Sequence, residues 1–201
     1  LKDAHHQLLR FAFDGTPLGE LSLPTAGSIM GLSGRRQDRD LYINFQSFLY
    51  PPTIFKVDME TAVFTTFRQP TIDFAIDQFE TTLKFATSKD GTQVPLFLTH
   101  RKGLILDGTH PTVLYGYGGF TVNMSPVFSS SRLLWLENGG VFAQAVLRGG
   151  NEYGEAWHAA GMLGNKQNVF DDFIGAAEWL ISSGYTSRKK LAIQGGSNGG
   201  L

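Results

Sequence analysis

Short runs of alternating apolar and polar residues fill the first third of the chain. They predict strands that are separated by turn residues such as Asp14-Gly15 and spaced roughly ten residues apart. The predicted strands cover residues 7–13, 18–23, 28–32, 41–45, 53–57 and 63–67. No helical periodicity interrupts them, so we expect an antiparallel all-β unit. One blade of a β-propeller has about four such strands, but the pattern alone fits a β-sandwich equally well.

The hydrophobic pattern changes from about residue 79. Residues 79–87 and 94–99 flank Lys89-Asp90-Gly91, which predicts a hairpin. Further along, apolar runs predict buried strands and alternate with segments of helical spacing. The strands are expected at residues 111–115, 141–146 and 191–193, and the helices at 129–137 and 170–183. Strands and helices in this order are typical of an α/β sheet with right-handed crossovers.

The clearest helical pattern covers residues 170–183. Its apolar residues recur three and four positions apart, which predicts that one face is buried. These residues are Phe170, Phe173, Ile174, Ala177, Leu180 and Ile181. Asn168 suits the N-cap, Asp171 and Asp172 suit the first turn, and Gly184 suits the end of the helix.

The two patterns predict two domains, residues 1–70 and residues 71–201, and we expect both to be incomplete. Hydrophobic residues make up 42% of the 201 positions, which is ample for packed cores. The net charge of −1 gives no reason to expect nucleic acid as a partner, and no apolar run is long enough to cross a bilayer.

The chain contains no cysteine, which excludes disulfides and thiolate metal sites. This composition fits a reducing compartment, so we expect a cytoplasmic protein. A periplasmic or secreted location stays open, because the sequence begins at Leu1 and not at methionine, so a preceding signal peptide is undecided.

The most specific motif is Gly195-Gly196-Ser197-Asn198-Gly199-Gly200, which follows the apolar run 191–193. A strand followed by Gly-x-Ser-x-Gly is the signature of a nucleophile elbow, a strained turn that presents its serine to substrate. Glycines are needed around the serine because other backbone segments pass close by. We expect Ser197 to be the nucleophile of an acyl transfer and the backbone N–H of Asn198 to donate to the oxyanion. The alternative is an ordinary exposed serine in a glycine-rich loop.

A second concentrated signal is Tyr115-Gly116-Tyr117-Gly118-Gly119-Phe120, which leaves a predicted strand and enters a glycine-rich loop. In α/β-hydrolases the loop after the equivalent strand supplies the second oxyanion donor. A tyrosine hydroxyl can serve as well as a backbone amide, and Tyr117 is the better placed of the two tyrosines. The alternative is that both tyrosines are ordinary strand residues.

The five histidines all precede Ser197, whereas the chain order in an α/β-hydrolase is Ser, Asp, His. We therefore expect the catalytic base and its carboxylate beyond Leu201, and we expect the 201 residues alone to be inactive and poorly folded. His158 is interpreted as structural. The pair His5-His6 has no third ligand at a suitable spacing, so we expect neither a metal nor another cofactor.

Several blocks along the chain together resemble the prolyl oligopeptidase family of serine peptidases. They include the loop 115–120 and the segment 195–201 described above. The others are Arg148-Gly149-Gly150-Asn151-Glu152-Tyr153-Gly154, Trp157-His158, Lys166-Gln167-Asn168 and Phe170-Asp171-Asp172-Phe173. One small departure is Asn151, where many members of the family carry glycine. It falls in a loop and affects none of the assignments.

The resemblance implies that residues 1–70 are the end of a seven-bladed β-propeller. Residues 71–201 would be the first half of an α/β-hydrolase domain. It further implies that Ser197 is the nucleophile, that the Tyr117 hydroxyl and the Asn198 N–H form the oxyanion hole, and that Phe120 lines the pocket for the residue before the cleaved bond.

The expected activity is hydrolysis of short peptides on the carboxyl side of proline by a monomer, with no nucleic acid or membrane as partner. Relatives of the oligopeptidase B type cut after Lys or Arg and tend to differ at Gly119, Phe120 and Asn198, where this chain resembles the proline-cutting branch. Alternatives are a basic-residue oligopeptidase, an acyl-peptide or ester hydrolase, and a non-catalytic propeller scaffold.

Overall fold

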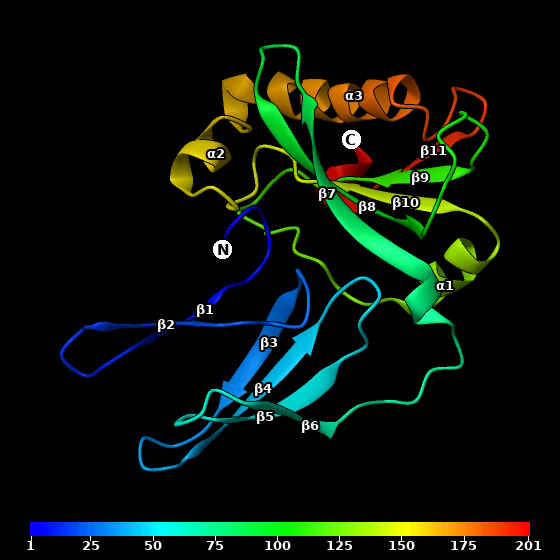
Figure 1. Ribbon diagram of the computed structural model, residues 1–201. Coiled ribbons are helices and arrows are strands. Elements are labelled where there is room, and N and C mark those ends of the chain that lie inside the picture. Colours follow the sequence, from blue (N-terminus) through cyan, green and yellow to red (C-terminus); the bar gives the residue numbers. More distant parts are fainter. The chain divides into compact units, whose positions relative to one another are not determined.

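The computed structural model describes residues 1–201, which divide into two compact units (Figure 1). The first unit comprises residues 1–74 together with 125–129, and the second comprises 75–124 and 130–201. Within the first unit, Ser28 Oγ donates to Pro126 O (2.7 Å) and the N–H of Phe128 donates to Gln46 Oε1 (3.1 Å). Nothing in the hydrophobic pattern indicated that the short segment 125–129 belongs with the strands near the N-terminus.

The first unit is entirely β-structure, as predicted. Its strands are β1 (Leu8–Phe11), β2 (Pro17–Leu21), β3 (Ser28–Ser33), β4 (Asp40–Gln46), β5 (Thr53–Asp58) and β6 (Phe64–Arg68). The first two form an antiparallel pair, and the other four form an antiparallel sheet in the order β3-β4-β5-β6. Alternate residues of β5 are buried, and Ile43 on β4 lies opposite Phe55 in the core. Four consecutive antiparallel strands are the make-up of one propeller blade.

The second unit is built on a five-stranded sheet in the order β11-β9-β10-β8-β7. Its strands are β7 (Phe79–Thr87), β8 (Gln93–Arg101), β9 (Thr112–Tyr115), β10 (Val141–Ala145) and β11 (Leu191–Gln194). The predicted hairpin is the antiparallel pair β7–β8. Strand β10 runs antiparallel to β8 and parallel to β9, and β11 is also parallel to β9. The sheet therefore starts antiparallel and becomes parallel where the chain adopts the alternating strand–helix pattern.

Helices connect the parallel strands. They are α1 (Ser130–Glu137), α2 (Glu155–Ala159) and α3 (Gln167–Ser182), with 3-10 turns at Ile76–Gln78, Leu163–Asn165 and Ser197–Gly200. Figure 1 shows α3 lying along the sheet, where Val169, Ala176 and Leu180 join the core with Leu96 and Leu114 of the strands. None of the helices has the length and apolar character that a membrane crossing requires.

The prediction for α3 was wrong in its start and in part of its buried face. The helix begins at Gln167 because the 3-10 turn Leu163–Asn165 leads directly into it through Lys166, whose backbone is already helical. Asn168 is therefore not the N-cap, and its Nδ2 instead donates to the carbonyl of Ala160 (2.9 Å). Ile174, which the pattern assigned to the buried face, is 52% exposed.

Asp172 is also not a solvated carboxylate of a first helical turn. It is fully buried and accepts hydrogen bonds from the backbone N–H, Nε and Nη2 of Arg148, at 3.0, 3.0 and 2.6 Å for the shortest contacts. The same guanidinium donates to Asp90 (2.5 Å) and to Ser88 Oγ (3.2 Å) in the turn between β7 and β8. One buried arginine thus ties the segment after β10 to α3 and to the hairpin.

We expect Asp172→Asn to lower the free energy of unfolding by about 3–5 kcal/mol, because the change leaves a buried arginine charge with only part of its compensation. The neighbouring substitution Asp171→Asn is the matched control, since Asp171 only accepts a hydrogen bond from Gln167 at the surface, and its effect should stay within about 0.5 kcal/mol. Urea denaturation of the two variants, made in the full-length protein that contains this chain, measures both. Equal losses in the two variants would contradict the structural role of the Arg148 cluster.

Candidate active site

The parallel strands bring three loops to one edge of the sheet. Tyr115, the last residue of β9, pairs with Gln144 on β10 and with Gln194, the last residue of β11. Because the carboxyl ends of these strands lie level, the segments that follow them meet at that edge. Ligands of open α/β sheets bind at the carboxyl ends of the strands. We call residues 116–120 the Tyr117 loop and residues 195–200 the nucleophile elbow.

Ser197 occupies the strained conformation that a nucleophile elbow requires. Its φ is +53°, a left-handed value that is unusual for a residue with a side chain. It is exposed and opens the 3-10 turn Ser197–Gly200, directly after the extended residue Gly196. A non-glycine residue held at positive φ costs about 1–3 kcal/mol and persists only where the surrounding structure imposes it.

The two glycines of the Gly-x-Ser-x-Gly core are needed for steric reasons. A Cβ at Gly195 would overlap the carbonyl oxygen of Gly199, and a Cβ at Gly199 would lie 2.5 Å from the carbonyl oxygen of Gly116. A Cβ at Gly196 would meet nothing within 4 Å. The elbow therefore folds back on itself at Gly195 and presses against the Tyr117 loop at Gly199.

The side chain of Asn198 links the elbow to the Tyr117 loop. Its Nδ2 donates to the carbonyl oxygens of Tyr117 (2.7 Å) and Gly118 (3.0 Å). Its Oδ1 accepts a hydrogen bond from Lys166 Nζ (3.0 Å), which also donates to Gly118 O (3.1 Å). Burial lowers the pKa of Lys166. The sequence predicts that Asn198 donates its backbone N–H and binds substrate, but it predicts neither these contacts of the Asn198 side chain nor a role for Lys166.

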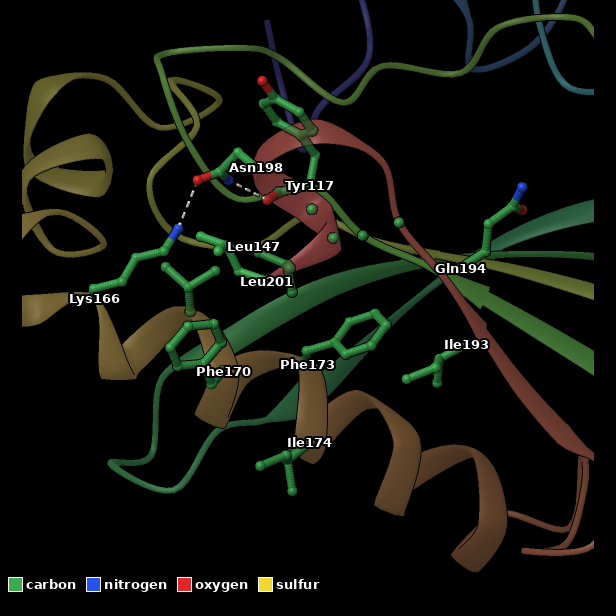
Figure 2. A pocket seen from close by; sticks show the side chains of 15 residues that line it. Tyr117, Leu147, Lys166, Phe170, Phe173, Ile174, Ile193, Gln194, Asn198 and Leu201 are labelled. Carbon is green, nitrogen blue, oxygen red and sulfur yellow. Dashed lines mark hydrogen bonds between the residues drawn. The ribbon is translucent and has the colours of Figure 1, made fainter.

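Two hollows border these residues. One of about 420 Å³ is lined by Tyr117, Asn198 and apolar side chains of α3 such as Phe173. Figure 2 shows the Tyr117 ring turned away from those apolar side chains, while Asn198 and Lys166 point toward each other. The other, about 310 Å³, is lined by Phe120, Asn198 and Lys166. The four site residues expected from sequence thus lie on two adjoining loops, with Phe120 and Asn198 sharing one hollow.

Phe120 is held in an unusual backbone conformation. Its φ is +53°, that of Thr121 is +57°, and Phe120 is 74% exposed. The N–H of Thr121 donates to the carbonyl of Gly149 (3.3 Å), and that of Val122 donates to Gly119 O (3.1 Å). Successive left-handed residues followed by these bonds turn the chain sharply and leave the aromatic side chain presented outward.

Two of the histidines make hydrogen bonds to the backbone that suit structural roles. His158 Nδ1 lies 2.7 Å from the carbonyl oxygen of Gly149, in keeping with its structural interpretation. His6 Nδ1 accepts the N–H of Ile29 (2.9 Å), and burial lowers the pKa of this imidazole. No group of three or more His, Asp or Glu side chains is arranged to hold a metal ion.

An exposed serine at positive φ, between a strand and a 3-10 turn and beside a loop that carries a tyrosine, can serve as the nucleophile of an acyl transfer. The sheet begins with antiparallel strands and continues with parallel ones, and the elbow follows its edge strand β11. Fold and site together define an α/β-hydrolase domain, and the first unit supplies part of a β-propeller.

Comparison with known proteins narrows this class. The model of the prolyl oligopeptidase family matches residues 126–201, and the model of the prolyl oligopeptidase N-terminal β-propeller domain matches residues 1–70. The chain belongs to the prolyl oligopeptidase family. The propeller, which the strand pattern could not separate from a sandwich, is thereby confirmed.

Individual relatives agree with this membership. The chain is 41% identical over 201 residues to the prolyl endopeptidase of Elizabethkingia meningoseptica, covering all of this chain and 28% of that protein. It is 44% identical over 208 residues to a prolyl oligopeptidase of Omphalotus olearius, again covering 100% of this chain and 28% of the relative. The chain thus spans 28% of the length of these curated relatives.

Solved structures show the same likeness. A structure from a study of two prolyl endopeptidases and their inter-domain dynamics superposes with a TM-score of 0.92 at 48% identity, covering 100% of this chain and 30% of that one. Prolyl oligopeptidase B of Galerina marginata, bound to a 35-residue hydrolysis and macrocyclization substrate, gives a TM-score of 0.90 at 34% identity, covering 98% of this chain and 29% of that one.

We expect Gly199→Ala to destabilise the protein by about 1–3 kcal/mol, as overpacking does, because the new methyl group would push the elbow away from Gly116. Gly196→Ala is the matched control, since its methyl group would enter open space and its φ of −140° suits any residue. Thermal unfolding of the full-length protein carrying each substitution, monitored by circular dichroism, compares the two variants. A Gly199→Ala variant as stable as Gly196→Ala would show that the close approach is not tight.

Proposed function

We propose that this chain carries the nucleophile and both oxyanion donors of a serine oligopeptidase that cleaves short peptides after proline. The observation that carries the proposal is Ser197 at φ +53°, on an elbow pressed against the Tyr117 loop. Membership of the prolyl oligopeptidase family and the names of the relatives support the choice of substrate.

In the proposed reaction Ser197 Oγ attacks the carbonyl carbon of the proline residue while a histidine base takes the hydroxyl proton. The carbonyl oxygen becomes an oxyanion that accepts hydrogen bonds from the Asn198 N–H and the Tyr117 hydroxyl. The C–N bond then breaks, the base returns its proton to the leaving amine, and water hydrolyses the acyl-enzyme by the same route. The base and its aspartate follow the serine in the chain order of this fold, and we place them in the part of the protein outside residues 1–201.

We propose that Phe120 contributes to the pocket for the proline side chain. The residue is exposed, its backbone is held at positive φ, and it lines the same hollow as Asn198, whose backbone N–H is a proposed oxyanion donor. A flat aromatic face suits the apolar pyrrolidine ring. We further propose that residues 1–70 close a propeller that admits only short peptides to the catalytic domain, residues 71–201.

The proposal is tested on the full-length protein that contains this chain, using fluorogenic peptide amides with proline or arginine before the cleaved bond. We expect turnover of the proline substrate and a loss of roughly 10⁴- to 10⁶-fold in kcat for Ser197→Ala. Preference for arginine would overturn the assignment to proline. Absence of both turnover and fluorophosphonate labelling of Ser197 would instead indicate a non-catalytic scaffold.

Tyr117→Phe should lower kcat by about 10²–10³-fold with little change in KM, because one donor to the oxyanion is removed and substrate contacts are kept. Tyr115→Phe, two residues earlier on β9, is the matched control and should retain the wild-type kcat. Steady-state kinetics with the proline substrate measures both. If the two variants behave alike, the Tyr117 hydroxyl is not an oxyanion donor.

A further inference from the structure

The side chain of Asn198 uses its hydrogen-bonding groups within the protein. Both amide hydrogens are directed to backbone carbonyls of the Tyr117 loop, at 2.7 Å for Tyr117 O and 3.0 Å for Gly118 O. The amide oxygen accepts from Lys166. The carboxamide therefore connects three segments, namely the elbow, the Tyr117 loop and the start of α3, whereas the proposed oxyanion donor is the backbone N–H of the same residue.

Lys166 lies where the electrostatics of a helix disfavour a positive charge. It stands immediately before α3, where the helix dipole disfavours a positive charge. Both of its hydrogen bonds go to uncharged oxygens, Asn198 Oδ1 (3.0 Å) and Gly118 O (3.1 Å), and burial lowers the pKa of the amine. Its ammonium lies 5.8 Å from the centre of the Phe170 ring. Stability of the helix does not explain a lysine at this position, but its contacts with the two loops do.

The backbone leaves room for these contacts only because glycines are present. A Cβ at Gly119 would lie 2.5 Å from Asn198 Nδ2. Gly118 has a φ of +62°, and a Cβ there would overlap Val169 of α3. The Tyr117 loop is thus shaped to lie against α3 on one side and to receive the Asn198 carboxamide on the other.

The sheet alone does not hold the two loops together where they carry their functional groups. The last backbone hydrogen bond between the two chain segments joins Gly116 N to the carbonyl oxygen of Gln194, the residue that ends β11, and it is already long, at 3.3 Å. Beyond it, the hydrogen bonds between the loops are those of the Asn198 side chain, which Lys166 supports. Catalytic groups must be held within about 0.5 Å of their productive geometry.

We propose that Lys166 and the side chain of Asn198 are positioning residues, which lock the Tyr117 loop onto the nucleophile elbow and keep the two oxyanion donors aligned. This inference rests on the proposed function. It assigns the two side chains a role separate from substrate contact, and it predicts that they act as one unit.

The test uses the full-length protein and four variants. Lys166→Met removes the amine and keeps the chain length, Lys166→Arg keeps donors, and Asn198→Ala keeps the backbone N–H. Lys189→Met, at an exposed site beyond α3, is the matched control. We expect Lys166→Met and Asn198→Ala to lower kcat by roughly 10- to 100-fold, the effect of a misplacement of about 1 Å. KM should change less than about threefold, and Lys166→Arg should recover most of the loss.

Two further measurements separate positioning from a general loss of structure. The double variant Lys166→Met/Asn198→Ala should be no slower than the slower single variant, since both changes break the same link. A peptide aldehyde ending in prolinal, which forms a hemiacetal with the serine, should bind roughly 10- to 100-fold more weakly to Lys166→Met. The product peptide ending in a proline carboxylate should bind as tightly as it does to the wild type.

If the wild type is active, any of three results would overturn the inference. The first is a wild-type kcat in Lys166→Met, and the second is a loss of kcat in the double variant that equals the product of the two single losses. The third is that Lys166→Met weakens binding of the aldehyde and of the product peptide equally. If a single variant fails to fold, Gly119→Ala breaks the same contact from the loop side, because its methyl group displaces the Asn198 carboxamide. We expect Gly119→Ala to lower kcat with little change in KM, and a variant with wild-type kinetics would contradict the inference. A wild-type protein without turnover would instead refute the proposed function.

Discussion

The parallel pairing of β11 with β9 is the constraint on which the site depends. It sets the ends of the two strands level at Gln194 and Tyr115, so that the chain leaving each strand must pass close to the other. Gly116 and Gly199 meet backbone to backbone for this reason, and the turn at Ser197 follows from the sharp reversal that this approach demands. Residues some 80 positions apart in the sequence are thereby brought to one edge.

Much of this arrangement could be predicted from sequence, because it depends on local signals. Strand periodicity located the strands to within a few residues, and the glycine pattern around Ser197 marked the elbow. Contacts across the fold could not be predicted in the same way. Asp172 has the sequence position of an ordinary helix-start carboxylate, and only the folded chain brings Arg148 to it. The start of α3 was misplaced because the preceding 3-10 turn has no strong sequence signal.

Arg148 and Lys166, two basic side chains near α3, have different partners and different roles. Burial would lower the pKa of Arg148, but hydrogen bonds with Asp172 and Asp90 outweigh it and raise the pKa. That arginine is a structural tie. Lys166 has no such carboxylate contacts, and burial lowers its pKa. Its amine donates instead to Asn198 Oδ1 and Gly118 O, contacts that fit the proposed positioning role better than a role in stability.

The positive φ of Ser197 has a consequence for how this sequence can evolve. Most residue types with a side chain would also bear backbone strain at position 197, whereas glycine would relieve it. Selection for a more stable fold and selection for a nucleophile therefore favour different amino acids at this one position. A lineage released from the need for catalysis would be free to replace the serine with glycine and would gain stability by doing so.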